Sequence, residues 1–450
     1  MSKKSDKNLI VGLDIGTSKV VAIVCEVTPD DEVEVIGIGS NPSKGLKKGV
    51  VVNIESTVQS IQRAIEEAEL MAGCQIQSVY AGIAGSHIRS LNSHGIVAIR
   101  DKEVVQGDVD RVIDAARAVA IPADQKILHI LPQEFVIDKQ EGIREPIGMA
   151  GVRLEAKVHL VTGAVSAAQN IIKCVLRCGL EVDDIILEQL ASSYSVLTED
   201  EKELVVCIVD IGGGTSDFTL LASDTSNSLR GYQVLGTSGI HIGGTNIDQV
   251  LAFKKIMPEL GMNTLMQSMN GTNITIPSTW FLKLSTWHQI NGLYQPAIIK
   301  NIQHSIASAL DTKRTTRLIK VLEKQYGHRI LEDVEHCKIR LSESDRTTVS
   351  LDEIENGLHI EVNKREFERI IEPVIVSIRD KIDELVSHCG LRNDSIDYVF
   401  YTGGTTLIPM VQHTINMMFP NSQALTGDML HSVGIGLTLD AEEKFGCTKT

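Results

Sequence analysis

The chain has 450 residues, 43% of them hydrophobic and 22% charged, which predicts a globular protein with more than one hydrophobic core. Its net charge of −15 argues against a broad nucleic-acid interface, because Lys and Arg must neutralise phosphates there. Gly12 and Asp14 interrupt the first apolar run, so we expect no signal peptide. Apolar runs such as LVVCIV are far shorter than the ~18 residues of a spanning helix, so we expect no membrane-spanning helix either. The scattered cysteines and histidines indicate a reduced, cytoplasmic protein without structural zinc.

The first part of the chain has the pattern of a β sheet covered by a helix. Residues 9–25, 33–40 and 78–85 are apolar or β-branched and predict strands. Residues 55–73 have apolar residues at helical spacing, with Ser56 as the expected N-cap and the closing glycine as the stop.

The pattern changes between residues 86 and 163, where a helix and two strands predict a small α+β unit inserted into a larger fold. Two helices then return the chain to the main domain, and the second half begins near residue 204. The predicted elements are a helix over 107–121, strands over 126–138 and 153–164, and helices over 166–180 and 186–197.

The second half opens like the first and then becomes less regular. Residues 257–292 are rich in Met, Asn and Thr, and we expect an irregular or loosely helical segment. Residues 315–344 predict one long amphipathic helix, and 347–362 predict a hairpin that turns at Asn356-Gly357. The remaining elements are a helix over 364–391, and a strand, glycine turn and helix over 395–419.

The stretch GLDIGTSK predicts a phosphate-binding hairpin. A buried strand carries Asp14 to its end, and Gly16 allows a tight turn in which backbone N–H groups approach an anion. Thr17, Ser18 and Lys19 add hydroxyl groups and a positive charge. A single copy of this pattern would favour an ordinary β hairpin, because glycine turns are common.

The stretch CIVDIGGGTSDFTLL repeats the pattern in the second half. Two such hairpins facing each other would hold a polyphosphate from both sides, and Asp14 and Asp210 would hold Mg²⁺ through water. Neither copy has the GxxxxGK[ST] spacing of a Walker A loop. The residues of the second copy are Asp210, Gly212, Gly213, Gly214, Thr215 and Asp217.

A third glycine motif, VFYTGGTTLIPMV, predicts the binding of a nucleotide base and ribose. An apolar strand ends at Tyr401, and Gly403 and Gly404 permit a flat ligand to approach the backbone. Thr405 and Thr406 could cap the helix that follows. Because the two matched hairpins occur together with this motif, we interpret all three as a nucleotide site.

These three motifs, in this order, resemble the superfamily of actin, the sugar kinases and the heat-shock chaperone ATPases. The resemblance implies an α/β fold, a duplicated ribonuclease-H-like (actin-like) ATPase with two lobes around a nucleotide cleft. Residues 1 to about 217 are similar to the cell-division family FtsA, which implies that 86–163 is the α+β subdomain that FtsA inserts. From about residue 218 the chain resembles a heat-shock chaperone ATPase domain, most closely the YegD type. The chain therefore looks like a hybrid, which a natural fusion, an engineered chimera or a computed design would equally explain.

The resemblance also implies roles for individual residues. Glu188 matches the chaperone position that orients the attacking water, and a helix-surface carboxylate is the open alternative. Asp14, Asp210 and Thr215 are the other implied catalytic residues. The implied nucleotide-binding residues are Gly16, Thr17, Ser18 and Lys19; Gly212, Gly213, Gly214 and Asp217; Gly243, Gly244 and Asp248 of a chaperone loop; Glu335, Lys338 and Ser342, whose spacing also fits a solvated helix face; and Gly403, Gly404 and Thr405.

The implied domain organisation follows the FtsA and chaperone patterns. The final stretch, LTLDAEEKFGCTKT, lacks the basic–aromatic amphipathic pattern of a membrane-binding helix, so we expect neither the membrane anchor of FtsA nor a chaperone substrate-binding domain. The implied segments are the first-lobe core 1–85, the inserted subdomain 86–163, the return helices 164–203, the second-lobe core 204–250, the outer subdomain 251–370, and the second-lobe core with the adenosine motif 371–450.

Two functions remain open at this point, and both imply ATP and Mg²⁺ as cofactors. In the first, an FtsA-like protein of the bacterial cytoplasm assembles with itself or recruits division proteins such as the tubulin-like FtsZ. That partnership is weakened because the FtsZ-docking surface of FtsA lies in its second half, and membrane association would come only through partners. In the second, a chaperone-like ATPase uses slow hydrolysis to open and close its cleft. A small-molecule kinase is a weaker third reading, because no residue stands out as a substrate base.

Overall fold

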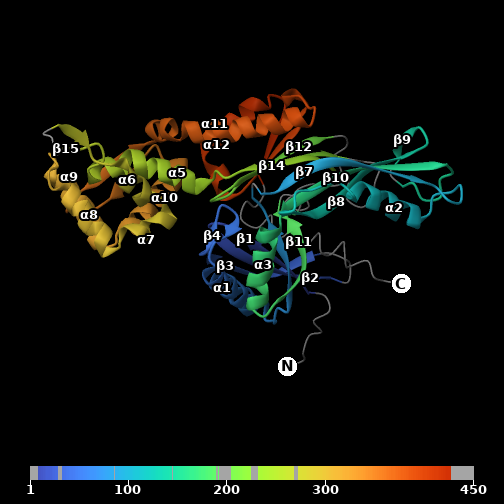
Figure 1. The fold of residues 1–450 in the computed structure, drawn as a ribbon, viewed down its shortest axis with the longest axis horizontal. Coiled ribbons are helices and arrows are strands. Elements are labelled where there is room, and N and C mark those ends of the chain that lie inside the picture. Colours follow the sequence, from blue (N-terminus) through green and yellow to red (C-terminus); the bar gives the residue numbers. More distant parts are fainter. Residues whose placement is uncertain are drawn as a thin grey trace. The chain divides into compact units, whose positions relative to one another are not determined.

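The computed structural model divides the chain into two compact units, which are described separately. Unit 1 comprises residues 1–243, 378–406 and 414–450, and unit 2 comprises 244–377 and 407–413. Figure 1 shows the elements in chain order. The residues that the structure describes are 9–28, 33–85, 87–143, 145–188, 191, 204–223, 232–267 and 272–426.

The first sheet of unit 1 has five strands in the order β11-β6-β1-β2-β3. β1 and β2 form the predicted antiparallel hairpin, in which Asp14 lies opposite Val21. β6 runs parallel to β1, and β11 runs parallel to β6. The bounds are β1 Leu9–Ile15, β2 Lys19–Val27, β3 Val33–Pro42, β6 Ser78–Ile83 and β11 Glu181–Leu187, and a short pair is formed by β4 Leu46–Lys47 and β5 Val50–Val51.

Helix α1 (Ile54–Ala72) packs on β2 and β3 through its apolar face. Its N-cap is Asn53, whose side chain accepts a hydrogen bond from the Ser56 backbone N–H. The prediction of Ser56 as N-cap was wrong, because the helix begins one turn earlier. Gly73 ends the helix with φ of 66°, as the sequence predicts.

The contact between β3 and α1 depends on Gly39. A β-carbon added there would collide with the Ala64 carbonyl oxygen and would lie 2.6 Å from the Ala68 backbone nitrogen. We expect Gly39→Ala to lower the free energy of unfolding by about 2 kcal/mol, the usual cost of overpacking, as measured by thermal or urea melting. Gly107→Ala is the matched control, because nothing lies within 4 Å of its added methyl group. An equal effect of both substitutions would contradict this reading of the contact.

The second sheet of unit 1 has the order β14-β13-β12-β19-β20. β12 (Val205–Ile211) and β13 (Ser216–Ser223) form the second predicted hairpin, in which Asp210 lies opposite Asp217. β12 also runs parallel to β19 (Tyr398–Thr402), the strand of the third motif. The outer strands are β14 Tyr232–Ile240 and β20 Gln423–Thr426.

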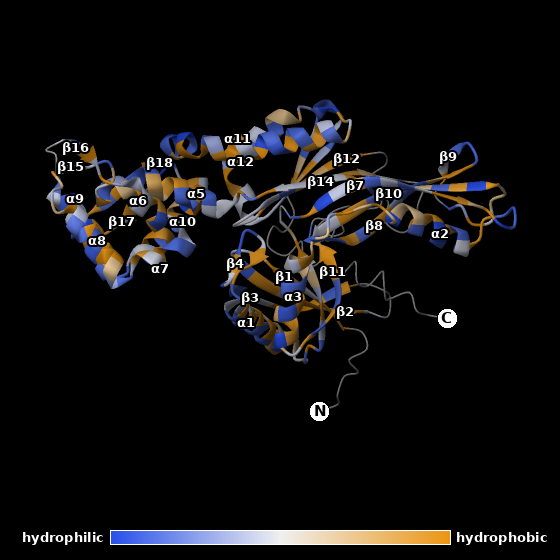
Figure 2. Cartoon of the chain, in the orientation of Figure 1, coloured by the Kyte–Doolittle hydropathy of each residue, from blue (hydrophilic) through white to orange (hydrophobic). Residues whose placement is uncertain are grey.

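Both sheets of unit 1 share one hydrophobic core. Val206, Ile208 and Phe400 of the second sheet belong to the same buried cluster as Val11 and Leu13 of the first. Figure 2 shows β1 and β12 in hydrophobic colours along much of their length. The tips of the two predicted hairpins therefore lie on one continuous scaffold.

A four-stranded sheet with the order β7-β10-β8-β9 and one helix forms a separate part of unit 1. It has its own buried cluster, to which Val112 of the helix and Leu160 of the central strand contribute. The elements are β7 Arg89–Ala98, α2 Gln106–Arg117, β8 Gln125–Ile137, β9 Gln140–Ile143 and β10 Arg153–Ala164.

The chain leaves that sheet through α3 (Val165–Arg177) and enters β11. The predicted helix over 186–197 is wrong at its start, because Ile186 and Leu187 end β11. The rest of that range lies outside the described residues, apart from Glu188 and Ala191. The predicted tail 437–450 also lies outside them.

Unit 2 is mainly helical, and it corrects two predictions. The stretch 315–344 forms two helices, which are separated at Gln325 with φ of 58°. The hairpin of β17 and β18 pairs Ser350 with His359, so eight residues connect its strands instead of a two-residue Asn356-Gly357 turn. The main elements are α5 Gly244–Leu251, α6 Ser278–Leu284, α7 Ile290–Leu293, α8 Pro296–Ile306, α9 Thr312–Glu323, α10 Gly327–Glu343, β15 Leu265–Gln267, β16 Asn273–Thr275, β17 Arg346–Ser350 and β18 His359–Asn363.

Two long helices complete the described chain. α11 (Lys364–His388) has residues in both units, and α12 (Pro409–Met418) follows the third motif. Within the described ranges, no helix is both long and apolar enough to cross a membrane.

Candidate functional site

The tips of the two predicted phosphate hairpins contact each other in unit 1. A β-carbon on Gly213 would collide with the Ser18 hydroxyl, and one on Gly214 would lie 2.7 Å from Thr17 Oγ1. The Thr17 hydroxyl also accepts a hydrogen bond of 3.1 Å from the Gly49 backbone N–H. Only glycine permits such an approach, because it has no β-carbon. The glycines of the second hairpin are therefore required by the contact between the hairpins as well as by the turn.

The third motif contacts the second hairpin. Gly403 has φ of 79°, and a β-carbon there would lie 2.6 Å from Asp210 Oδ1. The Thr405 hydroxyl donates a hydrogen bond of 2.9 Å to the Gly212 carbonyl oxygen. The predicted capping role of Thr405 and Thr406 was wrong, because a 3₁₀ turn over Gly404–Leu407 precedes α12. Thr405 instead holds the two motifs together.

Four carboxyl groups gather where these loops meet. Burial and the neighbouring Asp217 and Asp14 raise the pKa of Asp210 to about 8, and burial raises the pKa of Asp217 to about 7. Burial likewise raises the pKa of Asp14 to about 6, against the opposing charge of Lys19. Burial and the other three carboxylates hold the pKa of Glu188 well above its usual range. The folded protein therefore keeps protons on several of these acids at neutral pH, and a bound cation would favour their ionised forms.

The described residues contain no group of three or more His, Cys, Asp or Glu side chains placed to hold a metal ion directly, so the aspartates fit only a Mg²⁺ that keeps most of its water. Among the described residues, Asp14 Oδ1 is buried and has no hydrogen-bond partner, so its lone pairs are available to such a hydrated ion. Asp14 and Asp210 end the first strands of their hairpins, β1 and β12. Carboxylate oxygens at the edge of a phosphate site are the usual protein ligands of Mg²⁺, which keeps several waters of its own.

Glu188 lies among these carboxylates rather than on a solvated helix face. It follows β11 directly, and a β-carbon on Gly82 of the adjacent strand would lie 2.9 Å from Glu188 Cγ. Burial raises the pKa of Glu188, and the negative charges of Asp14, Asp210 and Asp217 raise it further. The register of β11 and β6 thus brings Glu188 to the same sheet end as the first hairpin.

Several residues near the hairpins were not predicted. Gly49 has φ of 73°, and a β-carbon added there would lie 3.5 Å from Thr215 Cγ2. The Gly85 N–H donates to Asp217 and lowers its pKa against the effect of burial. Burial, with a smaller effect of His241, lowers the pKa of His87 to about 4. The glycines of GLKKG and AGSH were the only sequence signal for these neighbours.

Gly243 is in unit 1, and an added β-carbon would lie 2.7 Å from Gly214 N. The other residues of the chaperone-like loop and helix belong to unit 2. Lys338 Nζ forms a buried ion pair of 3.0 Å with Asp248 Oδ2, and burial raises the pKa of Asp248 to about 6. Glu335 is exposed, Ser342 is half-buried, and Gly244 begins α5. Asp248, Glu335, Lys338 and Ser342 all belong to unit 2.

Two five-stranded sheets, each with a strand–turn–strand hairpin at its centre, define the actin-like ATPase fold. A solved structure, the PilM–PilN type IV pilus biogenesis complex, has a similar fold, with a TM-score of 0.56 and 13% sequence identity. The superposition covers 96% of this chain and 98% of the matched chain of that complex. The chain has the actin-like ATPase fold, and this fold is typical of nucleotide-binding proteins.

Sequence comparison identifies two sources of similarity. The family described as the SHS2 domain inserted in FtsA matches residues 85–162, and the family described as Hsp70 protein matches residues 302–442. The cell division protein FtsA of Pseudomonas aeruginosa is 70% identical over 239 residues, which are 53% of this chain and 57% of that protein. FtsA of Neisseria meningitidis serogroup B is 57% identical over 227 residues, and FtsA of Escherichia coli K12 is 53% identical over 239.

The chain spans about half the length of the curated FtsA relatives that it matches. About half of the chain is homologous to the bacterial cell-division protein FtsA, including the inserted domain, and an Hsp70 match follows in the second half. The hybrid prediction is confirmed at this level. The junction predicted near residue 217 is too early, because a match of 239 residues to FtsA must extend to at least about residue 239.

Proposed function

We propose that the protein binds ATP with Mg²⁺ and uses nucleotide binding to control self-assembly or the recruitment of bacterial division proteins, as an FtsA-like protein. The observation that carries this proposal is the meeting of two glycine hairpins and four carboxyl groups in unit 1. The similarity to FtsA over about half of the chain supports the division role. We propose a location at the cytoplasmic face of the membrane, reached through partners.

In this proposal the two hairpins hold the phosphates from opposite sides. Backbone N–H groups of Gly16, Gly213 and Gly214 would face the phosphate oxygens, while Thr17, Ser18 and Lys19 would add hydroxyl groups and a cation. The Gly212 N–H donates to the Thr215 carbonyl oxygen and closes the turn. Gly403 packs against the second hairpin, and Gly404 leaves room for adenosine. From the chaperone resemblance, we assign further adenosine contacts to Glu335, Lys338 and Ser342, with Gly243, Gly244 and Asp248 in the adjoining loop.

Catalysis, where it occurs, would be slow transfer of the terminal phosphoryl group to water. Mg²⁺, when bound, would neutralise phosphate charge. Asp14 and Asp210 would hold the hydrated ion, Asp217 would complete the acidic group, and Thr215 would position the second loop. Glu188 would orient the attacking water and accept its proton, since it gains basicity from its carboxylate neighbours.

Assembly on addition of ATP tests the FtsA-like function. We expect the full chain to sediment in the presence of Mg·ATP, to form filaments visible by electron microscopy, and to stay in the supernatant with EDTA. The Asp210→Ala variant is the control for dependence on nucleotide. Co-sedimentation with FtsZ, measured in parallel, reports whether that division protein is a partner.

A chaperone-like ATPase is the second candidate, and the Hsp70 match over residues 302–442 favours it. It predicts a monomer that hydrolyses ATP steadily without sedimenting. A monomer that turns over ATP at all protein concentrations would therefore replace the assembly proposal with the chaperone proposal.

A further inference from the structure

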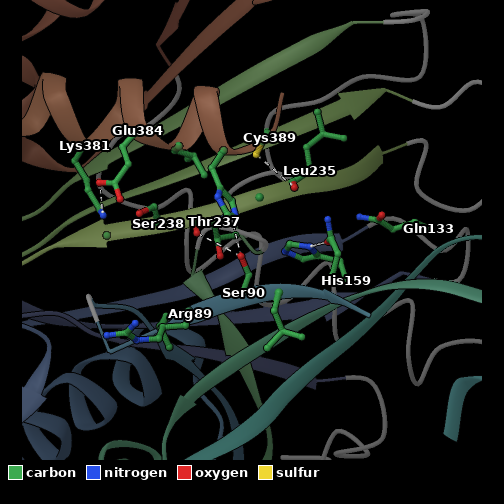
Figure 3. Close-up of a pocket in the computed structure, with 17 residues that line it drawn as sticks. Arg89, Ser90, Gln133, His159, Leu235, Thr237, Ser238, Lys381, Glu384 and Cys389 are labelled. Carbon is green, nitrogen blue, oxygen red and sulfur yellow. Dashed lines mark hydrogen bonds and ion pairs between the residues drawn. The ribbon is translucent and has the colours of Figure 1, made fainter. Parts of the chain in front are cut away.

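A cavity of unit 1 is lined by residues outside the two hairpins. It has a volume of about 500 Å³ and is bounded by β7, β10, β14 and the last turns of α11 (Figure 3). This volume is within the usual range for small-molecule sites. β7 and β14 are edge strands of their respective sheets, so the cavity lies where the inserted sheet adjoins the second sheet.

His159 presents a hydrogen-bond acceptor at this cavity. The side chain is 2% exposed, and its Nδ1 is 2.7 Å from the Oδ1 atom of Asn92, its cross-strand neighbour on β7. A carbonyl oxygen only accepts, so Nδ1 carries the proton and Nε2 keeps a lone pair. Burial lowers the pKa of His159 to about 4, which keeps the ring neutral. Nε2 is buried and has no hydrogen-bond partner.

Thr237 presents a second polar group without a partner. Its backbone N–H donates to the Ser90 hydroxyl at 3.3 Å, so the strand itself is fixed to β7. Its own hydroxyl oxygen is buried and has no hydrogen-bond partner. Figure 3 shows His159 and Thr237 approaching the cavity from different strands, with Ser90 between them in this view. Unmet buried polar groups of this kind destabilise the folded protein, so a ligand that supplies their hydrogen bonds is favoured.

The remaining lining limits the charge of a ligand. Leu91, Leu235 and Leu385 make part of the wall apolar. At the α11 side, Lys381 Nζ already pairs with Glu384 at 2.8 Å. Arg89 also lines the cavity, with an exposed side chain. At His159, an anion would place its lone pairs against that of Nε2, and a cation would find the lining carboxylate of Glu384 already paired. A neutral ligand with both a donor and an acceptor fits these groups.

We propose that this cavity binds a small neutral molecule with an aromatic ring and a primary amide. The amide N–H would donate to His159 Nε2, and the amide carbonyl oxygen would accept from the Thr237 hydroxyl. Such a ligand would connect the inserted sheet to the edge of the second sheet, so it would act on the arrangement of unit 1 without entering the nucleotide site.

Nicotinamide and nicotinate are a matched pair of probes, because they differ only in the amide or carboxylate on the same ring. We expect saturable binding of nicotinamide to the full chain, in saturation-transfer NMR and calorimetry, and at least tenfold weaker binding of nicotinate. Equal affinity for the two probes, or no saturable binding of nicotinamide up to its solubility, would overturn the proposal.

The Thr237→Val variant removes the hydroxyl and keeps the shape of the side chain. We expect about tenfold weaker nicotinamide binding, together with a higher melting temperature of the ligand-free protein, because an unmet buried hydroxyl is lost. Thr219→Val is the matched control: Thr219 lies opposite Thr237 on β13 and also has a buried, unpartnered hydroxyl, but it does not line the cavity. Its melting temperature should rise while its nicotinamide affinity stays at the wild-type value. Equal affinities of both variants and the wild type would contradict the proposal.

Discussion

Replacement of Asp210 by Ala is expected to abolish measurable binding of Mg·ATP. Asp210 ends β12 between the second hairpin and the third motif, where a β-carbon on Gly403 would lie 2.6 Å from its Oδ1. Removal of one partner from a desolvated charged contact costs about 2–5 kcal/mol, and each 1.4 kcal/mol is a factor of about ten in affinity. We therefore expect an affinity loss of at least about a hundredfold in calorimetry with Mg·ATP.

The control for this variant is Asp380→Ala, which removes an exposed carboxylate of α11 that pairs only with its neighbour Arg379 at 2.7 Å. Its affinity for Mg·ATP should equal that of the wild type. A melting curve of each variant without ligand shows whether the fold is kept. If folded Asp210→Ala binds and hydrolyses Mg·ATP like the wild type, the assignment of the two hairpins to the phosphates is wrong.

The second large effect expected is a fall in the stability of the metal-free protein as the pH rises. The folded-state pKa values of Asp14, Asp217 and Asp210 are raised to about 6, 7 and 8, above the usual 3.8. The folded protein then holds protons that the unfolded chain has released, so stability is greatest at low pH and falls as the pH passes these values. We expect a loss on the order of 3 kcal/mol between about pH 6.5 and about pH 8.5, since one pKa unit corresponds to about 1.4 kcal/mol.

Thermal melting in EDTA measures this loss, and the pH interval avoids the histidines with lowered pKa values, His87 and His159, which titrate near 4. The Asp210→Ala variant should show a much flatter dependence, because it lacks the carboxyl group with the highest pKa of the three. Addition of Mg²⁺ at the higher pH should restore the melting temperature of the wild type but not that of the variant. A wild-type stability that is constant or rises across this interval would contradict the clustering of these acids.

The sequence predicted the parts of the site that depend on local chain geometry. A strand, an acidic residue and a glycine turn are contiguous, so both hairpins and the strand of the third motif were found from their letters. The contacts between them were not predictable in the same way. Gly49 and Gly85 reach the hairpins through loops that follow other elements, and nothing in a short window of sequence shows what a distant turn will touch.

The errors have physical causes of a similar kind. Residues 315–344 keep helical apolar spacing through Lys324–Tyr326, and only the left-handed backbone at Gln325 separates α9 from α10. Asn356-Gly357 is a favourable two-residue turn, yet Leu351 and Ile354 are buried in the longer connection, so burial outweighed the local turn preference. The cavity between β7 and β14 was not predicted. His159 and Thr237 look like ordinary strand residues in the sequence, and only the folded chain brings their two sheets together.

The shared core of unit 1 also bears on how this chain came to fold. Val206, Ile208, Leu221 and Val234 lie in the FtsA-like part of the chain, and Phe400 lies in the Hsp70 match. All five pack in one cluster. Sequences of two different ancestries would then have to match in volume across a single interior, at native packing density. An excised FtsA-like segment would leave one wall of that interior open to water, so it should aggregate when produced alone, and recombination at this point could survive only where the two lineages had kept equivalent side-chain volumes.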